Sequence, residues 1–201
     1  KVEFGGHSKE FIEGSYIAIT SPGIPPKSEI FKKLKEQNIP VISEIELAYT
    51  ETQTPFFAIT GTNGKTTTTT LASHILSTEY KAPVCGNIGI PPTGLISEEN
   101  DYLVCEVSSF QLEFSPTFCP QIYAFLNFTP DHIDWHDGLE NYFKAKIRPL
   151  NHKPAFAIFN ATDPKLVEYT ETYTGEKFFF GKEFSPNCSY VKDDAIYFKR
   201  N

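Results

Sequence analysis

The residues with the clearest potential for chemistry form the loop Gly61-Thr-Asn-Gly-Lys-Thr66. An apolar, strand-like run over residues 55–60 precedes the loop, and a segment that predicts a helix follows it over residues 67–76. In a strand–loop–helix segment, glycines let successive backbone N–H groups turn towards phosphate oxygens, and the helix N-terminus adds a positive partial charge. The loop therefore predicts a binding site for the phosphates of a nucleotide.

Two side chains of the loop carry the chemistry of such a site. The ammonium group of Lys65 is suited to the terminal phosphates, and the hydroxyl group of Thr66 is suited to a magnesium ion. The match is incomplete, because Ile59 stands where the usual G-x-x-x-x-G-K-[ST] spacing has its first glycine. The alternative interpretation is a plain glycine turn between a strand and a helix.

Glu106 closes a second apolar run and is a candidate metal ligand. A carboxylate at the end of a buried strand is unfavourable unless it is paired or bound to a cation. Magnesium typically takes one or two carboxylates together with phosphate oxygens, so an ion beside the nucleotide would satisfy this group. The alternative is a glutamate that turns out to solvent at the end of its strand.

The loop over residues 129–136 contains two histidines, His132 and His136, and a helix candidate with Lys146 follows it. Either histidine alone is more typical of a hydrogen-bonded loop residue than of a ligand. Its position just after a strand favours a ligand role for His132 but not for His136. The helix candidate covers residues 139–147, where its mixture of apolar and basic residues predicts that Lys146 lies on a solvated face.

Three apolar runs supply the strands that would position these groups. They are continuous rather than alternating, which is typical of parallel strands covered on both faces. Each run ends in polar residues, and open parallel sheets bind ligands beyond the carboxyl ends of their strands. We therefore expect the glycine loop and the polar clusters to converge at one edge of a sheet. The runs cover residues 102–107, 121–126 and 155–159.

The first part of the chain predicts a separate, incomplete Rossmann-like unit. A strand over residues 15–20, a helix over 28–37 and a strand over 40–43 indicate a right-handed parallel crossover. The polar stretch 50–54 is the best linker candidate.

The predicted domains are therefore residues 1–52 and residues 53–201. The predicted fold class is α/β, with a mostly parallel sheet in a central domain of the P-loop ATPase type. From residue 177 onward we expect antiparallel strands, because an Asp193-Asp194 turn separates two short runs.

The composition limits the partners of the chain. Its 201 residues carry a formal net charge of −7, which leaves no basic surface for nucleic acid or an anionic bilayer. No apolar run reaches the ~18 to 20 residues of a membrane-spanning helix. The four cysteines show no C-x-x-C spacing, so we expect buried free thiols in a reducing cytoplasm. Because the chain contains no methionine, not even an initiator, we interpret it as an interior piece of a longer protein.

Five motifs, taken in order along the chain, resemble the Mur ligases of peptidoglycan synthesis. The resemblance extends over nearly the whole chain and weakens after about residue 175. The run after Glu106 and the segments 21–25 and 43–47 are most similar to the branch of the family that adds D-glutamate. The motifs are Gly61-Thr-Asn-Gly-Lys-Thr66, Gly86-Asn-Ile-Gly89, Glu106-Val-Ser-Ser-Phe-Gln-Leu-Glu113, Asn127-Phe-Thr-Pro-Asp-His-Ile-Asp134 and Tyr142-Phe-Lys-Ala-Lys146.

The resemblance implies roles for individual residues. It places Thr66 and Glu106 on a first magnesium ion and His132 on a second. It implies that CO₂ carbamylates Lys146 into a carboxylate-like metal ligand, which replaces the interpretation of this residue as part of a solvated face. The catalytic residues implied are Lys65, His132 and Lys146. The residues implied to hold the ATP phosphates are Gly61, Thr62, Asn63, Gly64, Lys65, Thr66 and Thr67.

The resemblance also implies a substrate and a reaction. Asn87, Ser108 and His132 would contact a muramoyl-alanine group, and Ser21 and Gly23 its diphosphate-uridine part. The parent protein would be a monomeric, cytoplasmic, ATP-dependent carbon–nitrogen ligase that joins D-glutamate to UDP-N-acetylmuramoyl-L-alanine through an acyl phosphate.

Two alternatives stay open, namely a sibling ligase such as a folylpolyglutamate ligase, and a P-loop NTPase that forms no bond. By the same resemblance, the chain lacks the start of the first domain, the end of the central domain and the whole third domain. We therefore expect the chain by itself to be inactive and to bind ATP weakly at best.

Overall fold

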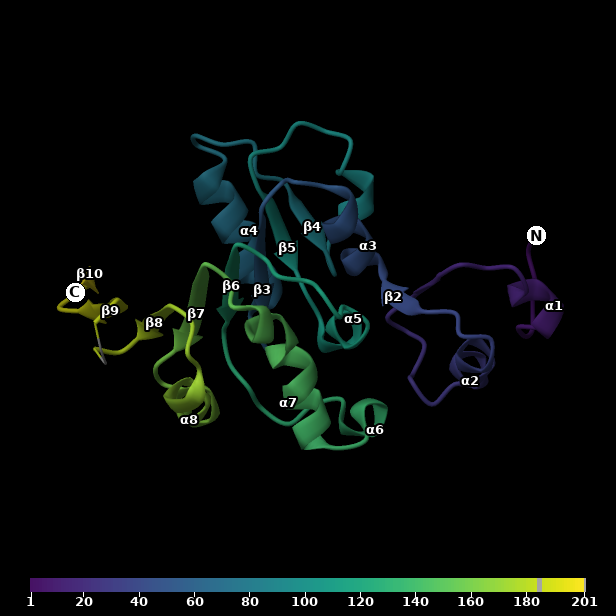
Figure 1. Ribbon diagram of the computed structural model, residues 1–201. Helices are drawn as coiled ribbons and strands as arrows, with labels where there is room; N and C mark the ends of the chain where they lie inside the picture. The colour runs from purple at the N-terminus through teal and green to yellow at the C-terminus, as the bar shows by residue number, and fades with distance from the viewer. Residues whose placement is uncertain (184–185, 201) are drawn as a thin grey trace.

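The computed structural model describes residues 1–183 and 186–200 and contains two sheets (Figure 1). The smaller sheet pairs β1 (Ala18–Thr20) with β2 (Val41–Ser43) in parallel, with α2 (Glu29–Glu36) between them along the chain. A four-residue helix, α1 (Lys9–Ile12), precedes this unit. The parallel crossover predicted for the first part of the chain is therefore confirmed, although β1 is shorter than predicted.

The larger sheet has eight strands in the order β10-β9-β8-β7-β6-β3-β5-β4. All neighbouring strands in it are parallel except β9 and β10. The mostly parallel α/β class predicted from the apolar runs is confirmed. The strands are β3 (Phe56–Thr60), β4 (Val84–Gly86), β5 (Leu103–Glu106), β6 (Ile122–Phe125), β7 (Phe156–Asn160), β8 (Lys177–Gly181), β9 (Cys188–Lys192) and β10 (Ala195–Lys199).

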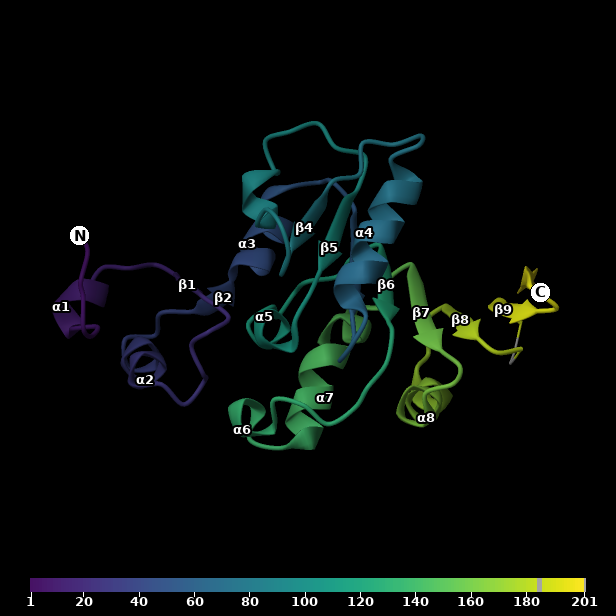
Figure 2. The same ribbon diagram turned by 180° about the vertical axis from the view of Figure 1, so that it is seen from behind.

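Helices cover both faces of the larger sheet. Figures 1 and 2 show α4 and α7 on opposite faces, and the two main apolar clusters correspond to these two layers. Two short 3₁₀ segments cover residues 92–94 and 148–152. The helices are α3 (Glu44–Glu51), α4 (Lys65–Leu76), α5 (Ser109–Glu113), α6 (Ile133–His136), α7 (Leu139–Ile147) and α8 (Pro164–Thr172).

The strands are apolar throughout because successive side chains enter different layers. Ala58 packs in the cluster beneath α5, α7 and α8, while its neighbour Ile59 packs in the cluster beneath α4. The same alternation holds for Cys105 and Val104 on β5. A sheet buried in this way needs no polar alternation. The four cysteines are free thiols, as predicted, but only three of them are buried, because Cys119 is half-buried.

The antiparallel arrangement predicted from residue 177 onward is wrong for β8. This strand runs parallel to both β7 and β9, and only β9 and β10 form an antiparallel pair. The reason is α8, which carries the chain from β7 back to the start of the sheet and so sets β8 parallel. A start signal for α8 is present in the sequence, since Asp163 caps the helix and Pro164 is its first residue.

Helix α3 joins the first unit to the larger sheet. Its residues Ile45 and Ala48 are fully buried in the main core, although residues 1–52 form the first of the two predicted domains. The carboxylate of Glu46 accepts hydrogen bonds from the backbone N–H groups of Thr117 (2.9 Å) and Phe118 (3.0 Å). The boundary at residue 52 stays a prediction.

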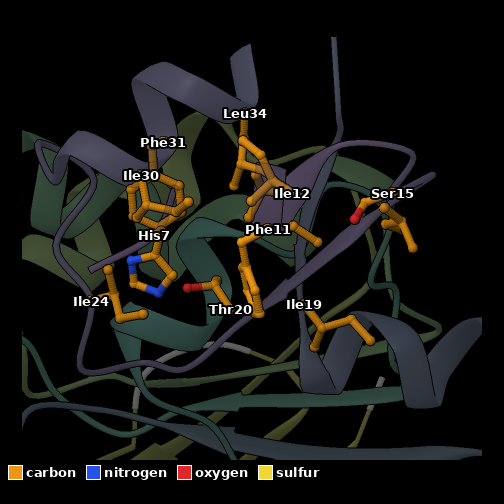
Figure 3. Close-up of a pocket in the computed structure, with 13 residues that line it drawn as sticks. His7, Phe11, Ile12, Ser15, Ile19, Thr20, Ile24, Ile30, Phe31 and Leu34 are labelled. Carbon is orange, nitrogen blue, oxygen red and sulfur yellow. The ribbon is translucent and has the colours of Figure 1, made fainter. Parts of the chain in front are cut away.

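The small unit contains a cavity of about 290 Å³ between α1, α2 and β1 (Figure 3). Its lining is mainly apolar, and Figure 3 labels His7, Ser15 and Thr20 as its polar members. In the part of the chain that the structure describes, no helix is long and apolar enough to cross a membrane.

Candidate functional site

The glycine loop connects β3 to α4 at the carboxyl edge of the larger sheet. Gly64 precedes the helix with φ of 81°, a conformation that L side chains rarely adopt. A Cβ atom on Gly61 would lie 3.1 Å from the Cβ of Leu126, so the close approach to β6 also favours glycine. Lys65 folds over the loop, and its Nζ donates to the carbonyl oxygens of Gly61 and Thr62 at 3.0 Å each. The loop is therefore a preformed turn that ends in a helix N-terminus.

Asn127 fixes the tip of this loop. Its Oδ1 accepts from the backbone N–H of Asn63, and its Nδ2 donates to the carbonyl of the same residue, both at 2.9 Å. The Thr62 N–H also donates to the Asn127 carbonyl at 3.1 Å. Asn127 belongs to one of the five motifs, but no role was predicted for it. Its position just beyond β6, the strand beside β3, is the signal for this contact.

Glu106 lies beside the loop and has almost no exposed surface (2%). Its Oε2 accepts from the Thr66 hydroxyl at 2.7 Å, and its Oε1 accepts from Asn87 Nδ2 at 2.9 Å. The alternative of a glutamate turned to solvent is therefore wrong. The strands explain the contact, because β3 and β5 are adjacent and Ile59 is paired with Glu106.

The residues at this point fit a magnesium ion. A hydroxyl oxygen and a buried carboxylate oxygen lie within 2.7 Å of each other at the start of α4, and Mg²⁺ prefers such ligands combined with phosphate oxygens. Within residues 1–183 and 186–200, no group of three or more His, Cys, Asp or Glu side chains is arranged to hold a metal ion. The remaining ligands of an ion at this point would be phosphate oxygens or water.

Lys146 lies on α7 with only 1% of its surface exposed. Its Nζ donates to the carbonyl of Gly61 at 2.9 Å and to the hydroxyl of Thr60 at 3.3 Å, and it lies 4.9 Å from the centre of the Tyr142 ring. Burial, together with the nearby charge of Lys65, lowers the pKa of Lys146 to about 7. At neutral pH a large fraction of this amine is therefore uncharged.

The interpretation of Lys146 as part of a solvated face is wrong. Lys144 and Arg148 are four residues apart on the helix and share one side, whereas Lys146 is two residues from each and points elsewhere. It is four residues after Tyr142 and three after Phe143, both of which are buried. This spacing was available in the sequence and predicts that Lys146 faces the core.

His132 occupies the outer edge of the site, with 47% of its side chain exposed. Its backbone has φ of 50°, and its Nε2 lies 3.4 Å from Asp131 Oδ2. Its ring lies 6.2 Å from that of Tyr142, whose hydroxyl is 3.2 Å from Thr62 Oγ1. The Tyr142 side chain thus lies between His132 and the loop, whereas Thr66 and Glu106 are hydrogen-bonded directly to each other.

His136 is the other histidine of this segment, and it is buried. Its Nε2 lies 2.9 Å from the hydroxyl of Ser109. Burial, with smaller contributions from the charges of Lys146 and His132, lowers the pKa of His136 to about 4. The imidazole is therefore neutral at pH 7, and its interpretation as a hydrogen-bonded loop residue agrees with this contact.

A polar cavity of about 450 Å³ lies next to Glu106, between the small unit and the larger sheet. It contains two of the residues predicted to bind substrate, Ser21 and Asn87, and also Glu44 and Gln111, which the sequence argument missed. The other three, Gly23, Ser108 and His132, are not among the lining residues. The Ser108 hydroxyl is instead hydrogen-bonded to Gln111 as the cap of α5.

Gly86 positions Asn87 in this cavity. A Cβ atom on Gly86 would lie 2.2 Å from the carbonyl oxygen of Glu106, and its φ is 97°. The next residue, Asn87, donates its N–H to that same carbonyl at 2.9 Å.

Thr67, the last predicted phosphate contact, is exposed on α4 and lines a shallow hollow with Thr66 and Thr70.

The fold and the loop define an α/β nucleotide-binding domain of the P-loop class. Residues 59–200 match the model of the Mur ligase middle domain, so the chain belongs to the Mur ligase family.

The chain is similar to enzymes named UDP-N-acetylmuramoylalanine--D-glutamate ligase. It is 40% identical to the one from Thermoanaerobacter pseudethanolicus over 98% of this chain and 45% of that protein. It is 47% identical to the one from Lachnoclostridium phytofermentans over 84% of this chain and 37% of that protein. The chain thus spans about half the length of the curated relatives it matches or less.

Solved structures of Mur ligases share the fold. A MurF ligase from Thermotoga maritima in complex with ADP matches with a TM-score of 0.60 and 16% identity, over 90% of this chain and 57% of that one. A UDP-N-acetylmuramate:L-alanyl-gamma-D-glutamyl-meso-diaminopimelate ligase from Neisseria meningitides matches with a TM-score of 0.64 and 14% identity, over 96% and 68%.

Proposed function

We propose that this chain supplies the ATP site and part of the sugar-nucleotide site of a ligase that joins D-glutamate to UDP-N-acetylmuramoyl-L-alanine. One observation carries the proposal. The Glu106 carboxylate accepts hydrogen bonds from Thr66 at the end of the glycine loop and from Asn87, which lines the cavity beside it, so one side chain connects the two candidate sites. The names of the relatives supply the substrates of the proposal.

The proposed reaction has two steps. The alanyl carboxylate attacks the γ-phosphorus of ATP, the bond to the β–γ bridging oxygen breaks, and ADP leaves. The amine of D-glutamate then attacks the acyl carbon, loses a proton and expels inorganic phosphate. No nucleophile from the protein is needed, so catalysis rests on positioning and charge neutralisation.

The residues of this chain would contribute binding and charge. The backbone N–H groups of residues 61–67 and the ammonium of Lys65 would hold the phosphates, and Asn87 would hold the sugar side. A magnesium ion on Thr66 and Glu106 would neutralise phosphate charge. We place the reaction in the cytoplasm, which is supported by the four free cysteines.

The test is the dependence of ADP release on substrates in the full-length protein. We expect sustained release only when UDP-N-acetylmuramoyl-L-alanine and D-glutamate are both present, at most one ADP per enzyme without D-glutamate, and almost none with Lys65→Ala. ATP turnover without these substrates would favour an NTPase that forms no bond. Turnover with a folate and glutamate instead would favour the sibling ligase.

We also propose that Lys146 is carbamylated. The uncharged amine would attack CO₂ and release one proton, and the low pKa and burial of Lys146 support this step. Lys146→Ala should be inactive and should regain part of its activity with short carboxylic acids. The matched control is Lys144→Ala on the exposed side of the same helix. Its activity should equal that of wild type and should not change when the carboxylic acids are added. Full activity of Lys146→Ala without an added acid would refute the role.

A further inference from the structure

The first residues of α5 contact the segment that carries His132. Ser108 caps the helix, Ser109 is bonded to His136, and the next ring is that of Phe110. The Phe110 ring centre lies 4.7 Å from that of His132 and 4.6 Å from that of Trp135. It also stacks on His136 with an interplanar angle of 11°.

The segment with His132 needs such support because it cannot hold its own conformation. Helix α6 has only four residues, and isolated helices of this length are unstable in water. It lies between two residues with left-handed backbones, His132 (φ 50°) and Asp137 (φ 59°). Such conformations persist only where the surrounding structure fixes them.

The hydrogen bond between Ser109 and His136 is the buried part of this support. Ser109 is 2% exposed and His136 is 6% exposed, so neither group has water as a ready substitute partner. His132, in contrast, is largely exposed and its ring rests on Phe110. The buried anchor of the segment is therefore His136, which lies four residues after His132, the side chain whose position it would fix.

We propose that His136 is a positioning residue that, through Ser109, holds His132 and α5 at a fixed separation on the sugar side of the site. His136 itself touches no predicted ligand position in this arrangement. The kinetic part of this proposal rests on the function proposed above, but the structural part does not. Neither Ser109 nor His136 bonds to the phosphate loop. The His136 ring reaches it only through Tyr142, 5.2 Å away, whose hydroxyl is 3.2 Å from Thr62 Oγ1, so nucleotide binding should depend on the pair much less than sugar binding does.

The structural test is NMR of the His132 ring in the full-length protein labelled with ¹³C-histidine, with His132→Gln used for assignment. Ser109→Ala removes only a hydroxyl group, and His136→Phe keeps the ring but removes the hydrogen bond. We expect both to shift and broaden the His132 Cε1–H signal, and His136→Gln to restore much of its position. An unchanged signal in Ser109→Ala would overturn the proposal, whether or not the protein proves to be a ligase.

The kinetic test separates positioning from a general loss of stability. Ser109→Ala and His136→Phe should each lower kcat/KM for the UDP-sugar by about 10- to 100-fold, as for partners that orient metal-binding histidines. The KM for ATP should stay within about twofold of wild type. The double variant should be no worse than the worse single one, because the pair acts as a unit. Additive losses, or equal losses for ATP and the UDP-sugar, would overturn the proposal.

Discussion

Replacing Lys146 with methionine should change how the stability of the protein depends on pH. The side chain is buried and its ordinary pKa of 10.5 is lowered to about 7. In the unfolded chain, the same amine titrates near its ordinary value. Methionine fills a similar volume and carries no proton in this range.

The direction in which the free energy of unfolding changes with pH follows from proton binding to Lys146 in the folded and unfolded states. Between pH 7 and 10.5 the unfolded chain binds the proton more tightly, so the free energy of unfolding rises with pH. The slope is about 1.4 kcal/mol per pH unit, which gives roughly 5 kcal/mol across the whole window. Below pH 7 both states are protonated and the full cost of the buried charge is present. Lys146→Met should be about 2 to 4 kcal/mol more stable than wild type at pH 7, because two lost hydrogen bonds of about 1 kcal/mol each offset part of the gain.

The assay is urea unfolding of wild type and variant from pH 6.5 to 10, in buffers without CO₂ or magnesium. The quantity to follow is the difference between the two proteins, because most other groups titrate alike in both, and His136, whose pKa of about 4 depends on Lys146, lies below the pH range used. We expect the advantage of the variant to disappear as the pH rises. Lys144→Met on the exposed side of α7 is the matched control, and its difference from wild type should stay constant. If the free energies of unfolding of Lys146→Met and wild type differed by the same amount at every pH, the assignment of Lys146 as a buried, weakly basic amine would be refuted.

Three further predictions concern the loop and the cavity beside it. Lys65→Ala should slow ADP formation in the full-length ligase by a factor of about 10² to 10³, by analogy with the loss of one oxyanion donor of ~3 to 4 kcal/mol, and near-normal rates would contradict a phosphate role. Asn127→Ala removes both side-chain bonds to Asn63 and should weaken ATP binding in calorimetry, while the exposed control Asn141→Ala should not. Gly86→Ala should lower the melting temperature and displace Asn87, because its Cβ would lie 2.2 Å from a backbone oxygen, and a melting curve like that of wild type would disprove this close contact.

The contact between Thr66 and Glu106 could be predicted because strand order makes it local. Parallel strands bring their carboxyl ends to one edge. Glu106 ends β5, and Thr66 follows the loop after β3, the strand beside it. The apolar runs predicted the sheet for the same reason, since full burial leaves a continuous pattern.

The remaining features depend on packing between distant segments. The burial of Lys146 results from α7 lying against Thr60 and Gly61, a contact across more than eighty residues that the charges near it conceal. The parallel direction of β8 depends on α8, and the Asp163 cap that begins this helix was not used in the prediction. The two hydrogen bonds from the Asn127 side chain to Asn63 depend on the geometry of the glycine turn. In each case a local signal is present, but the contact itself is made only when distant segments pack together.

Glu106 has one consequence that concerns thermodynamics rather than chemistry. Its two carboxylate oxygens hold partners from different pockets, so a ligand that draws this group towards one partner alters the other hydrogen bond. Linkage then requires reciprocity: the factor by which the nucleotide changes affinity for the sugar equals the factor by which the sugar changes affinity for the nucleotide. Glu106→Gln should reduce both factors together, and titrations performed in the two orders would measure them.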